Sequence, residues 1–217
     1  MGFKGCSTVA RGPGRPPLLD AEARETRILD AAQQVILRRG LAGASMSAIA
    51  REAGMSKRTL YDVFDNRAAL FSAIIQRIRN AVTRPLTEEE TALPLADRLR
   101  LLLSPSCDEL PGHIPTAILR AVVAEAERQP DLAREFLQEG PHAVRALIRA
   151  ELDRSVARGE LMIDDTAAAA SLLADMAHEN VIGHLVQPRH GDTVEAAFHR
   201  RLDLAIRVFE RGIAGQV

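Results

Sequence analysis

Apolar residues recur along most of the chain every three or four positions, the spacing of an α-helix with one buried face. Between residues 24 and 39, for example, Ile28, Ala32 and Val35 fall on one side of such a helix. The same spacing predicts further helices at 45–54, 56–64, 70–82, 94–104, 115–128, 131–157, 165–186 and 193–214. No segment alternates as a strand would, so the pattern predicts an all-α fold.

Two local signals interrupt this helical pattern. Gly40 follows a pair of arginines, as is typical of a helix C-terminus, so the first helix is expected to end there. The dipeptide Gly140-Pro141 falls inside the predicted helix 131–157. Because proline has no amide hydrogen and clashes with the preceding turn, we expect it to kink or split this helix.

Charge divides the chain into two parts. Residues 1–85 contain 14 Lys and Arg against 7 Asp and Glu, whereas the remainder contains 14 against 22. The acidic run TEEE marks the change, and we predict a flexible basic tail at 1–20, a small helical domain at 21–84 and a larger helical domain at 85–217. The basic first part suggests a polyanionic partner, although chance segregation of charge on solvated helices would give the same totals.

The composition is that of an ordinary globular protein, with 47% hydrophobic and 26% charged residues among 217. No run approaches the ~18 apolar residues of a transmembrane helix, and the first residues lack the apolar centre of a secretory signal. We therefore expect a cytoplasmic protein without a membrane partner. Cys6 and Cys107 are too few and too distant to suggest a disulfide framework or a metal site, and we interpret both as free thiols.

The segment around Gly54 has the features of a helix-turn-helix. Gly54 lies where the chain must turn tightly between two short helices, and Ser56 can cap the second helix by binding its free amides. Lys57, Arg58 and Thr59 then occupy the first turn, which is the part of such a helix that contacts base edges in a major groove.

The chain's only tyrosine fits the same interpretation. Arg58 can bind guanine through two hydrogen bonds, with a discrimination of about 1–3 kcal/mol against a wrong base. Tyr61 follows two residues after Thr59, where its hydroxyl can meet a phosphate oxygen while its ring packs on the small domain.

The run SMSAIAREAGMSKRTLYDVFDNRAALF at 45–71 resembles the N-terminal domain of the TetR family of bacterial one-component regulators. The resemblance includes the pairs Ile49-Ala50 and Ala53-Gly54 and the triplet Thr59-Leu60-Tyr61. It implies an all-α homodimer with an N-terminal three-helix DNA-binding domain containing the helix-turn-helix, followed by a larger C-terminal helical domain for ligand binding and dimerisation. By position, it implies DNA contacts from Ser45, Ser47, Ser56, Lys57, Arg58, Thr59, Tyr61 and Arg67.

Some positions depart from the family pattern. Arg67 stands where the family usually has lysine, and the resemblance implies that it still binds a phosphate. Val63 replaces a residue that is often polar, so no DNA contact is expected there, and Met55 in the turn is expected only to pack. The leading segment RGPGRPP partly resembles a minor-groove hook, but a disordered basic tail with nonspecific affinity is the favoured alternative.

The larger domain contains the candidates for an effector pocket. The segment RAVVAEAERQPDLAREFLQEGP at 120–141 resembles the AefR-type subgroup of the same family. Candidate pocket residues are the apolar Phe136, Leu173 and Met176 and the polar His113, His142, His178 and Asn180. They suggest a small hydrophobic or amphipathic effector, although a residue such as each of the apolar ones is more often part of an ordinary core than a ligand contact. Asp175 and His178 share a helix face, but no metal, cofactor or catalytic motif accompanies them, so no metal or cofactor is expected.

The last two predicted helices are candidates for a dimer interface. Phe198, Leu202, Ala205 and Phe209 form one stripe, and Leu172, Val181 and Leu185 lie on the preceding helix. Periodicity alone fits an interface and an intrachain core equally well, and the resemblance favours the interface. Two-fold symmetry would place two recognition helices about 34–36 Å apart on a near-palindromic operator.

The sequence thus predicts a sequence-specific DNA-binding regulator of transcription and not an enzyme. We expect a homodimeric repressor that binds a double-stranded DNA operator and is released by a small effector. Two alternatives remain open at this point. One is a helical small-molecule-binding protein or enzyme, and the other is a non-specific architectural DNA-binding protein.

Overall fold

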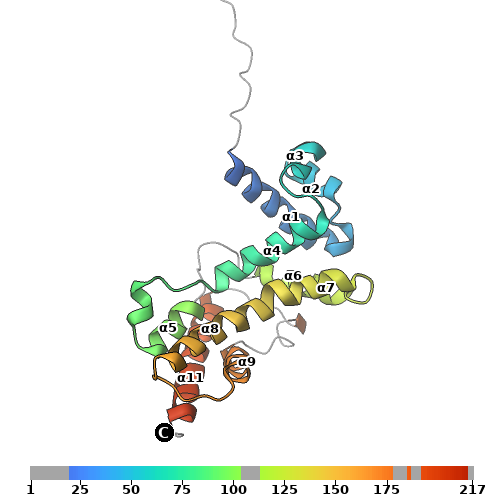
Figure 1. The fold of residues 1–217 in the computed structure, drawn as a ribbon. Coiled ribbons are helices and arrows are strands. Elements are labelled where there is room, and N and C mark those ends of the chain that lie inside the picture. The colour runs from blue at the N-terminus through green and yellow to red at the C-terminus, as the bar shows by residue number, and fades with distance from the viewer. Residues whose placement is uncertain (1–19, 104–112, 178–184, 187–191, 215–217) are drawn as a thin grey trace, which may run out of the picture.

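The computed structural model describes residues 20–103, 113–177, 185–186 and 192–214, and all regular structure in these ranges is helical (Figure 1). The fold is therefore all-α, as the sequence predicts. The longer helices are α1 (Ala21–Gly43), α2 (Met46–Glu52), α3 (Lys57–Tyr61), α4 (Arg67–Val82), α5 (Leu95–Leu103), α6 (His113–Glu125), α7 (Pro130–Leu137), α8 (Ala143–Ala157), α9 (Thr166–Ala177) and α11 (Asp192–Ala214). A 3-10 turn, η1 (Glu89–Ala92), precedes α5, and a π-helical turn, η2 (Gln138–His142), joins α7 to α8.

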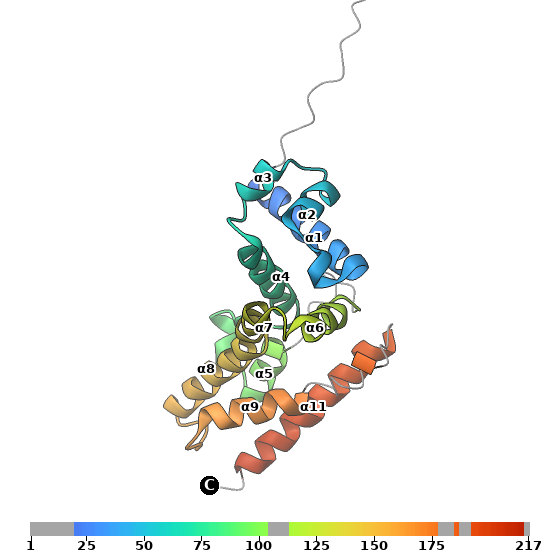
Figure 2. The ribbon, with the colours of Figure 1, turned by 90° about the vertical axis from the view of Figure 1, so that its right-hand side faces the viewer.

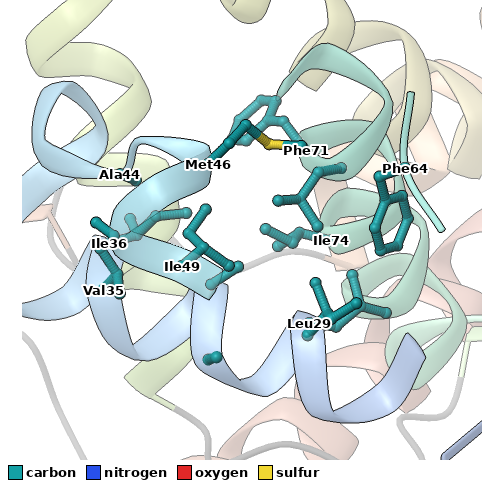
Figure 3. Close-up of a cluster of buried hydrophobic side chains, with 14 of the residues drawn as sticks. Leu29, Val35, Ile36, Ala44, Met46, Ile49, Phe64, Phe71 and Ile74 are labelled. Atoms are coloured by element: carbon teal, nitrogen blue, oxygen red, sulfur yellow. The ribbon is translucent and has the colours of Figure 1, made fainter. Parts of the chain in front are cut away.

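Helices α1 to α4 form the part that we call the head, residues 20–84. Its core is a cluster of large aliphatic and aromatic side chains contributed by α1, α2 and α4, with Phe64 from the loop before α4 (Figure 3). Ile28, Ile49 and Ile74 are almost completely buried there. Because apolar burial is worth about 1.5–3 kcal/mol for each such side chain, this cluster is what holds helices as short as α2 and α3 in place.

The remaining residues, from Pro85 onward, form the body. The head's core continues into the body through buried side chains of α6 and α7, among them Ile118, Val122 and Leu132. A second core joins α5, α8, α9 and α11 at the end of the body away from the head (Figure 2). The two cores make α6 and α7 the part of the body that touches the head, while α9 and α11 lie side by side further away.

The helix boundaries differ from the predicted ones at interpretable places. Asp20 caps α1 by accepting a hydrogen bond of 2.7 Å from the Ala23 amide, so this helix begins three residues earlier than predicted. Gly40 has a φ of 67° and breaks the helix as expected, but one more helical turn follows it. Helix α3 ends at Tyr61 rather than near Phe64.

The predicted interruption of helix 131–157 is confirmed. Helix α7 ends at Leu137, Pro141 lies inside the π-helical turn η2, and α8 begins at Ala143. The wider turn accommodates the proline ring, which has no place in a regular α-helical ladder. The predicted helix 165–186 is seen as α9 up to Ala177, and residues 178–184 lie outside the described ranges. The tail predicted for residues 1–20 also lies almost wholly outside them.

Candidate DNA-binding surface

Two serine caps and one glycine shape the helix-turn-helix. The Ser45 hydroxyl accepts a hydrogen bond of 3.2 Å from the Ala48 amide at the start of α2. The chain then turns at Gly54, whose φ of 65° favours glycine over any residue with a side chain. The Ser56 hydroxyl accepts a hydrogen bond of 3.0 Å from the Thr59 amide and lies 2.8 Å from the Thr59 hydroxyl, which fixes the first turn of α3.

Helix α3 turns nearly all of its polar side chains outward. Lys57 and Arg58 are exposed, and neither forms a hydrogen bond or ion pair with any residue in the described part of the chain. Tyr61 is 47% exposed, whereas Leu60 is completely buried in the head's core. A single buried side chain therefore attaches α3 to the head, and the two cations are left uncompensated on its surface.

Nearby charges behind this surface are used differently. Arg38 of α1 forms an ion pair of 2.6 Å with Glu52 at the end of α2. The hydrogen bond from Arg38 holds the pKa of the Glu52 carboxyl below its usual range. This pair connects α1 to α2. On the outward face of α3, Lys57 and Arg58 are not paired with any carboxylate of the described residues.

The start of α2 adds small polar groups to the same surface. Ser45 and Ser47 are both exposed, and the Ser45 hydroxyl is engaged as the helix cap. Met55 packs against the head's core, as predicted, and Val63 packs against the same core. Seven of the eight predicted DNA contacts therefore belong to one continuous segment, from Ser45 to Tyr61.

Arg67, for which the resemblance implies a phosphate contact, has hydrogen-bond partners within the chain. This residue begins α4, and its guanidinium is partly buried. One terminal nitrogen donates a hydrogen bond of 2.8 Å to the Gln129 side-chain oxygen in the body, and the other donates to the Leu41 carbonyl in the last turn of α1. A motif position places Arg67 at the helix start, but it contains no information about Gln129, which lies 62 residues away.

The candidate effector residues do not gather in one cavity of the described structure. Phe136 packs against the head's core, whereas Leu173 and Met176 belong to the second core in the body. His142 is exposed. The side chains of His113, His178 and Asn180 lie outside what the structure describes.

The predicted dimer stripe on α11 faces the protein's own core instead. Leu202, Ala205 and Phe209 are buried against α5, α8 and α9, and Phe198 packs on the same cluster. The intrachain alternative is the correct one for this stripe, because α11 has to cover the apolar faces of α5 and α9. Of the candidates on the preceding helix, Leu172 is 58% exposed, Leu185 is half-buried and Val181 lies outside the described residues.

A different apolar face on the same two helices is open to solvent. Leu204 and Val208 of α11 are 54% and 51% exposed, one helical turn apart, and Leu172 is exposed on neighbouring α9. The predicted stripe of α11 did not include Leu204 and Val208, which lie on the other side of the helix.

The body contains a buried ionic cluster that was not predicted from the sequence. Arg98 of α5 and Glu151 of α8 are both completely buried, with an ion-pair distance of 3.2 Å, and Arg98 also pairs with Glu160. Burial raises the pKa of the Glu160 carboxyl, but the hydrogen bond and the charge of Arg98 outweigh it and leave that pKa below its usual range. A signal was present, because Arg98 and Glu151 both occupy apolar-face positions of their helices.

The fold and the exposed cations of α3 define a helix-turn-helix regulator with a separate helical body. Residues 28–74 match the family of bacterial regulatory proteins of the tetR type, and residues 113–212 match the C-terminal domain of AefR-like transcriptional repressors. An uncharacterised HTH-type transcriptional regulator of Mycobacterium tuberculosis is 30% identical over 177 residues, which are 80% of this chain and 83% of that protein. The HTH-type regulator UidR of Escherichia coli K12 is 26% identical over 160 residues, which are 73% and 80% of the two chains.

Solved structures agree with these matches. A TetR transcriptional regulator from Agrobacterium tumefaciens has a TM-score of 0.65 at 23% identity and covers 88% of this chain and 94% of its own. The flavonoid-responsive regulator FrrA has a TM-score of 0.63 at 26% identity, with 88% and 97% covered. The chain therefore belongs to the TetR family of bacterial transcriptional regulators. It is a DNA-binding regulator of transcription and not an enzyme, as predicted.

Within the described ranges, no helix is both long enough and apolar enough to cross a membrane.

Proposed function

We propose that the protein is a transcriptional repressor that binds a near-palindromic operator as a homodimer and leaves it when a small effector binds the body. The observation that supports this most directly is the outward face of α3, where Lys57 and Arg58 are exposed and uncompensated beside Tyr61. A cation without an intrachain partner can meet a DNA phosphate or base without first breaking an ion pair.

Each exposed group has a chemically suitable partner on a duplex. The Arg58 guanidinium matches the two acceptors of guanine in the major groove, and Lys57 and the Thr59 hydroxyl suit either bases or phosphates. The Tyr61 hydroxyl and the Ser47 hydroxyl suit phosphate oxygens, and the free amides at the start of α2 add partial positive charge beside Ser45. The head at 21–84 would thus contain all groups that recognise the operator.

The second copy of the chain would cover the exposed apolar face of α9 and α11. Burying Leu172, Leu204 and Val208 removes three large apolar side chains from water, each worth about 1.5–3 kcal/mol before the entropy of association is subtracted. Relatives in this family act as dimers, and a two-fold axis along α9 and α11 would leave both heads free at the other end of the body.

The effector would be a small hydrophobic or amphipathic molecule bound in the body, and the protein would act in the cytoplasm, where its DNA is. FrrA is named as flavonoid-responsive, so planar aromatic compounds belong in a first panel of candidate effectors. An effector that shifts the operator affinity by 5- to 150-fold corresponds to a coupling free energy of about 1–3 kcal/mol.

Selection of bound duplexes from random DNA tests this function directly. The full-length protein should enrich a near-palindrome whose half-sites are about 10–10.5 base pairs apart, or a multiple of that distance. The variant K57A/R58A should enrich nothing under the same conditions while keeping its helical circular dichroism spectrum. Tight binding without sequence enrichment would instead identify an architectural DNA-binding protein, and the absence of DNA binding would refute the proposal.

A further inference from the structure

Helix α7 of the body is bound to the head at its N-terminal end through Arg67. The Gln129 side-chain oxygen, one residue before α7, accepts a hydrogen bond of 2.8 Å from the Arg67 guanidinium. The Gln129 amide nitrogen in turn donates a hydrogen bond of 3.2 Å to Glu125 at the end of α6. This second bond fixes the orientation of the amide group, so that its oxygen points towards Arg67.

The same guanidinium also contacts α1. Its other terminal nitrogen donates to the Leu41 carbonyl, in the helical turn that follows the break at Gly40. Arg67 therefore joins the end of α1, the start of α4 and the start of α7. A planar guanidinium is suited to this task because its donors diverge in fixed directions.

The C-terminal end of α7 is bound to α4 by a separate set of contacts. The Glu139 carboxylate in η2 accepts hydrogen bonds of 3.0 Å from Gln76 and 3.3 Å from Arg79, and the Glu139 carbonyl accepts one of 3.2 Å from Arg79. A β-carbon at Gly140 would lie 3.5 Å from the Ile75 side chain, in ordinary van der Waals contact. Helix α7 is thus attached at both of its ends to α4, the last helix of the head.

We propose that Arg67 is a positioning residue that sets the orientation of the head on the body, and that it does not bind a DNA phosphate. To reach a phosphate, its guanidinium would have to leave Gln129, and the amide oxygen would lose its hydrogen bond in a partly buried site. Lys57 and Arg58, in contrast, are exposed and have no hydrogen-bond or ion-pair partner among the described residues. This inference rests on the proposed operator binding by the head.

The consequence for the dimer is a constraint on half-site spacing. Each body is fixed to its partner, and each head is fixed to its body by the apolar core shared with α6 and α7, by the Arg67–Gln129 contact and by the Glu139 contacts. Without the contact of Arg67, the shared core and the Glu139 contacts remain, but the start of α4 is no longer bound to the start of α7, so the orientation of the head is less restricted. A protein whose head is less restricted discriminates less between operators whose half-sites differ in spacing.

A double-mutant cycle in urea unfolding, without DNA, tests the contact itself. The effects of Arg67→Met and Gln129→Met on the free energy of unfolding should be non-additive. The unfolding equilibrium constant of the double variant should differ by roughly three- to tenfold from the value expected if the two single effects were independent. Gln129→Glu keeps an acceptor for Arg67 but replaces the donor to Glu125 by a carboxylate oxygen, so it should keep the coupling to Arg67 while losing part of the stability. Additive effects would show that the contact does not exist in solution and would overturn the proposal.

The salt dependence of DNA binding separates a positioning role from a phosphate contact. The probe is the duplex that the wild-type protein selects from random DNA. Loss of a phosphate ligand lowers the slope of log K against log salt by about 0.9 for each contact, hence by about 1.8 for a dimer. We expect Arg67→Met to leave this slope unchanged, whereas Lys57→Met, which removes an exposed cation suited to a phosphate, should lower it. A slope lowered by Arg67→Met would overturn the proposal.

The ratio of affinities for operators with different half-site spacing is a third measurement. A loss of stability alone would not change this ratio. Operators with one base pair added or removed between the half-sites should regain affinity relative to the selected duplex in both Arg67→Met and Gln129→Met. Arg134→Met, which removes an exposed ion pair on α7, should leave the discrimination intact. If Arg67→Met does not fold, Gln129→Met tests the proposal by itself, because this variant keeps Arg67 but removes its acceptor. Unchanged spacing discrimination in Gln129→Met would refute the proposal.

The two proposals can fail separately. If no duplex is enriched from random DNA, the proposed operator binding is wrong, yet the unfolding cycle still decides whether Arg67 and Gln129 are coupled. If a duplex is enriched and the cycle is additive, only the positioning role is wrong.

Discussion

The head and the body use their cations in opposite ways. On α3 in the head, Lys57 and Arg58 are exposed and have no partner among the described residues. In the body, Arg98 is completely buried and lies against Glu151 and Glu160. It also donates hydrogen bonds of 3.0 Å to the Ser155 hydroxyl and 3.3 Å to the Thr91 carbonyl.

The difference follows from the cost of removing a charge from water. A buried guanidinium is tolerated only when carboxylates and hydrogen-bond acceptors surround it, so the Arg98 cluster is an internal structural element. An exposed guanidinium such as that of Arg58 is already solvated and can exchange water for a phosphate or a base edge. A structural site and a binding surface can both contain cations. They differ in whether those cations already have partners within the chain.

Helix α11 adds a third case to this comparison. Its outward face has the exposed arginines 200, 201, 207 and 211 around Leu204 and Val208, and none of these arginines pairs within the described structure. By the same criterion they are available for an external partner. We proposed a second copy of the chain for this face, so these arginines would lie at or around the edge of the dimer interface.

The largest expected effect is on the free energy of unfolding and concerns the buried Arg98 in the body. Arg98→Met removes the cation that pairs with the buried Glu151 and with Glu160, and leaves Glu151 with Arg154 as its one remaining cation among the described residues, so it should lower the free energy of unfolding by up to about 3–5 kcal/mol. Urea unfolding monitored by circular dichroism measures this change. Arg149→Met removes a solvent-exposed arginine from the same body and should change stability by less than about 0.5 kcal/mol. R98M/E151M should recover part of the loss, and equal stability of the single and double variants would contradict the interpretation.

The next effect concerns the head. Arg58→Ala should weaken operator binding by about 1–3 kcal/mol for each half-site, because the bidentate contact to guanine is lost. Fluorescence anisotropy with the selected duplex measures the affinity. The melting temperature should stay the same, since the Arg58 side chain makes no hydrogen bond or ion pair within the described structure. Unchanged affinity would show that α3 is not the recognition helix.

A third effect tests the outer face of α11. Leu204→Arg should weaken dimerisation by about 1.5–3 kcal/mol per copy, because an apolar side chain at the interface is replaced by a further cation among the exposed arginines of α11. Sedimentation equilibrium measures the association constant. Val123→Arg alters an exposed apolar residue on α6 and should leave the dimer intact. Equal dimerisation of both variants would place the interface elsewhere.

The smallest effect is a pH dependence near the boundary between head and body. Two hydrogen bonds from Arg84, of 2.6 and 2.7 Å, together with one from the Thr87 amide, lower the pKa of Glu90 to about 2. A depressed folded-state pKa stabilises the protein above the ordinary value of about 4.5, and this stabilisation is lost as the pH falls towards 2.

Urea unfolding of wild type and Glu90→Gln between pH 6 and 2 tests this expectation. The two proteins should differ at pH 6 and converge as the pH approaches 2, because the wild-type carboxyl becomes neutral there. Glu89→Gln, the exposed neighbour, is the matched control and should run parallel to the wild type. A constant difference across the range would contradict the assignment.

Local signals in the sequence were sufficient for the head. The cap Ser56 and the turn at Gly54 act on neighbouring residues, and the structure has both where the sequence places them. The interruption at Pro141 is equally local, since it follows from one missing amide hydrogen. Such features depend on a few consecutive residues and can be predicted without knowing the tertiary fold.

Contacts between distant residues could not be predicted in the same way. The periodicity of α11 shows that Leu202 and Leu204 lie on different faces but not which face meets the protein's own core. The direction of the Arg67 side chain depends on Gln129, and the burial of Arg98 depends on Glu151. In each case the missing information was the identity of the partner in space.

The attachment of α3 to the head through Leu60 alone has a consequence for how such regulators diverge. Of its five residues, only Leu60 is completely buried, so Lys57, Arg58 and Tyr61 can be exchanged with little change in packing. Natural variants could therefore acquire new target sites by substitutions on α3 while the scaffold keeps its stability. The same property makes α3 a convenient place to engineer altered promoter specificity.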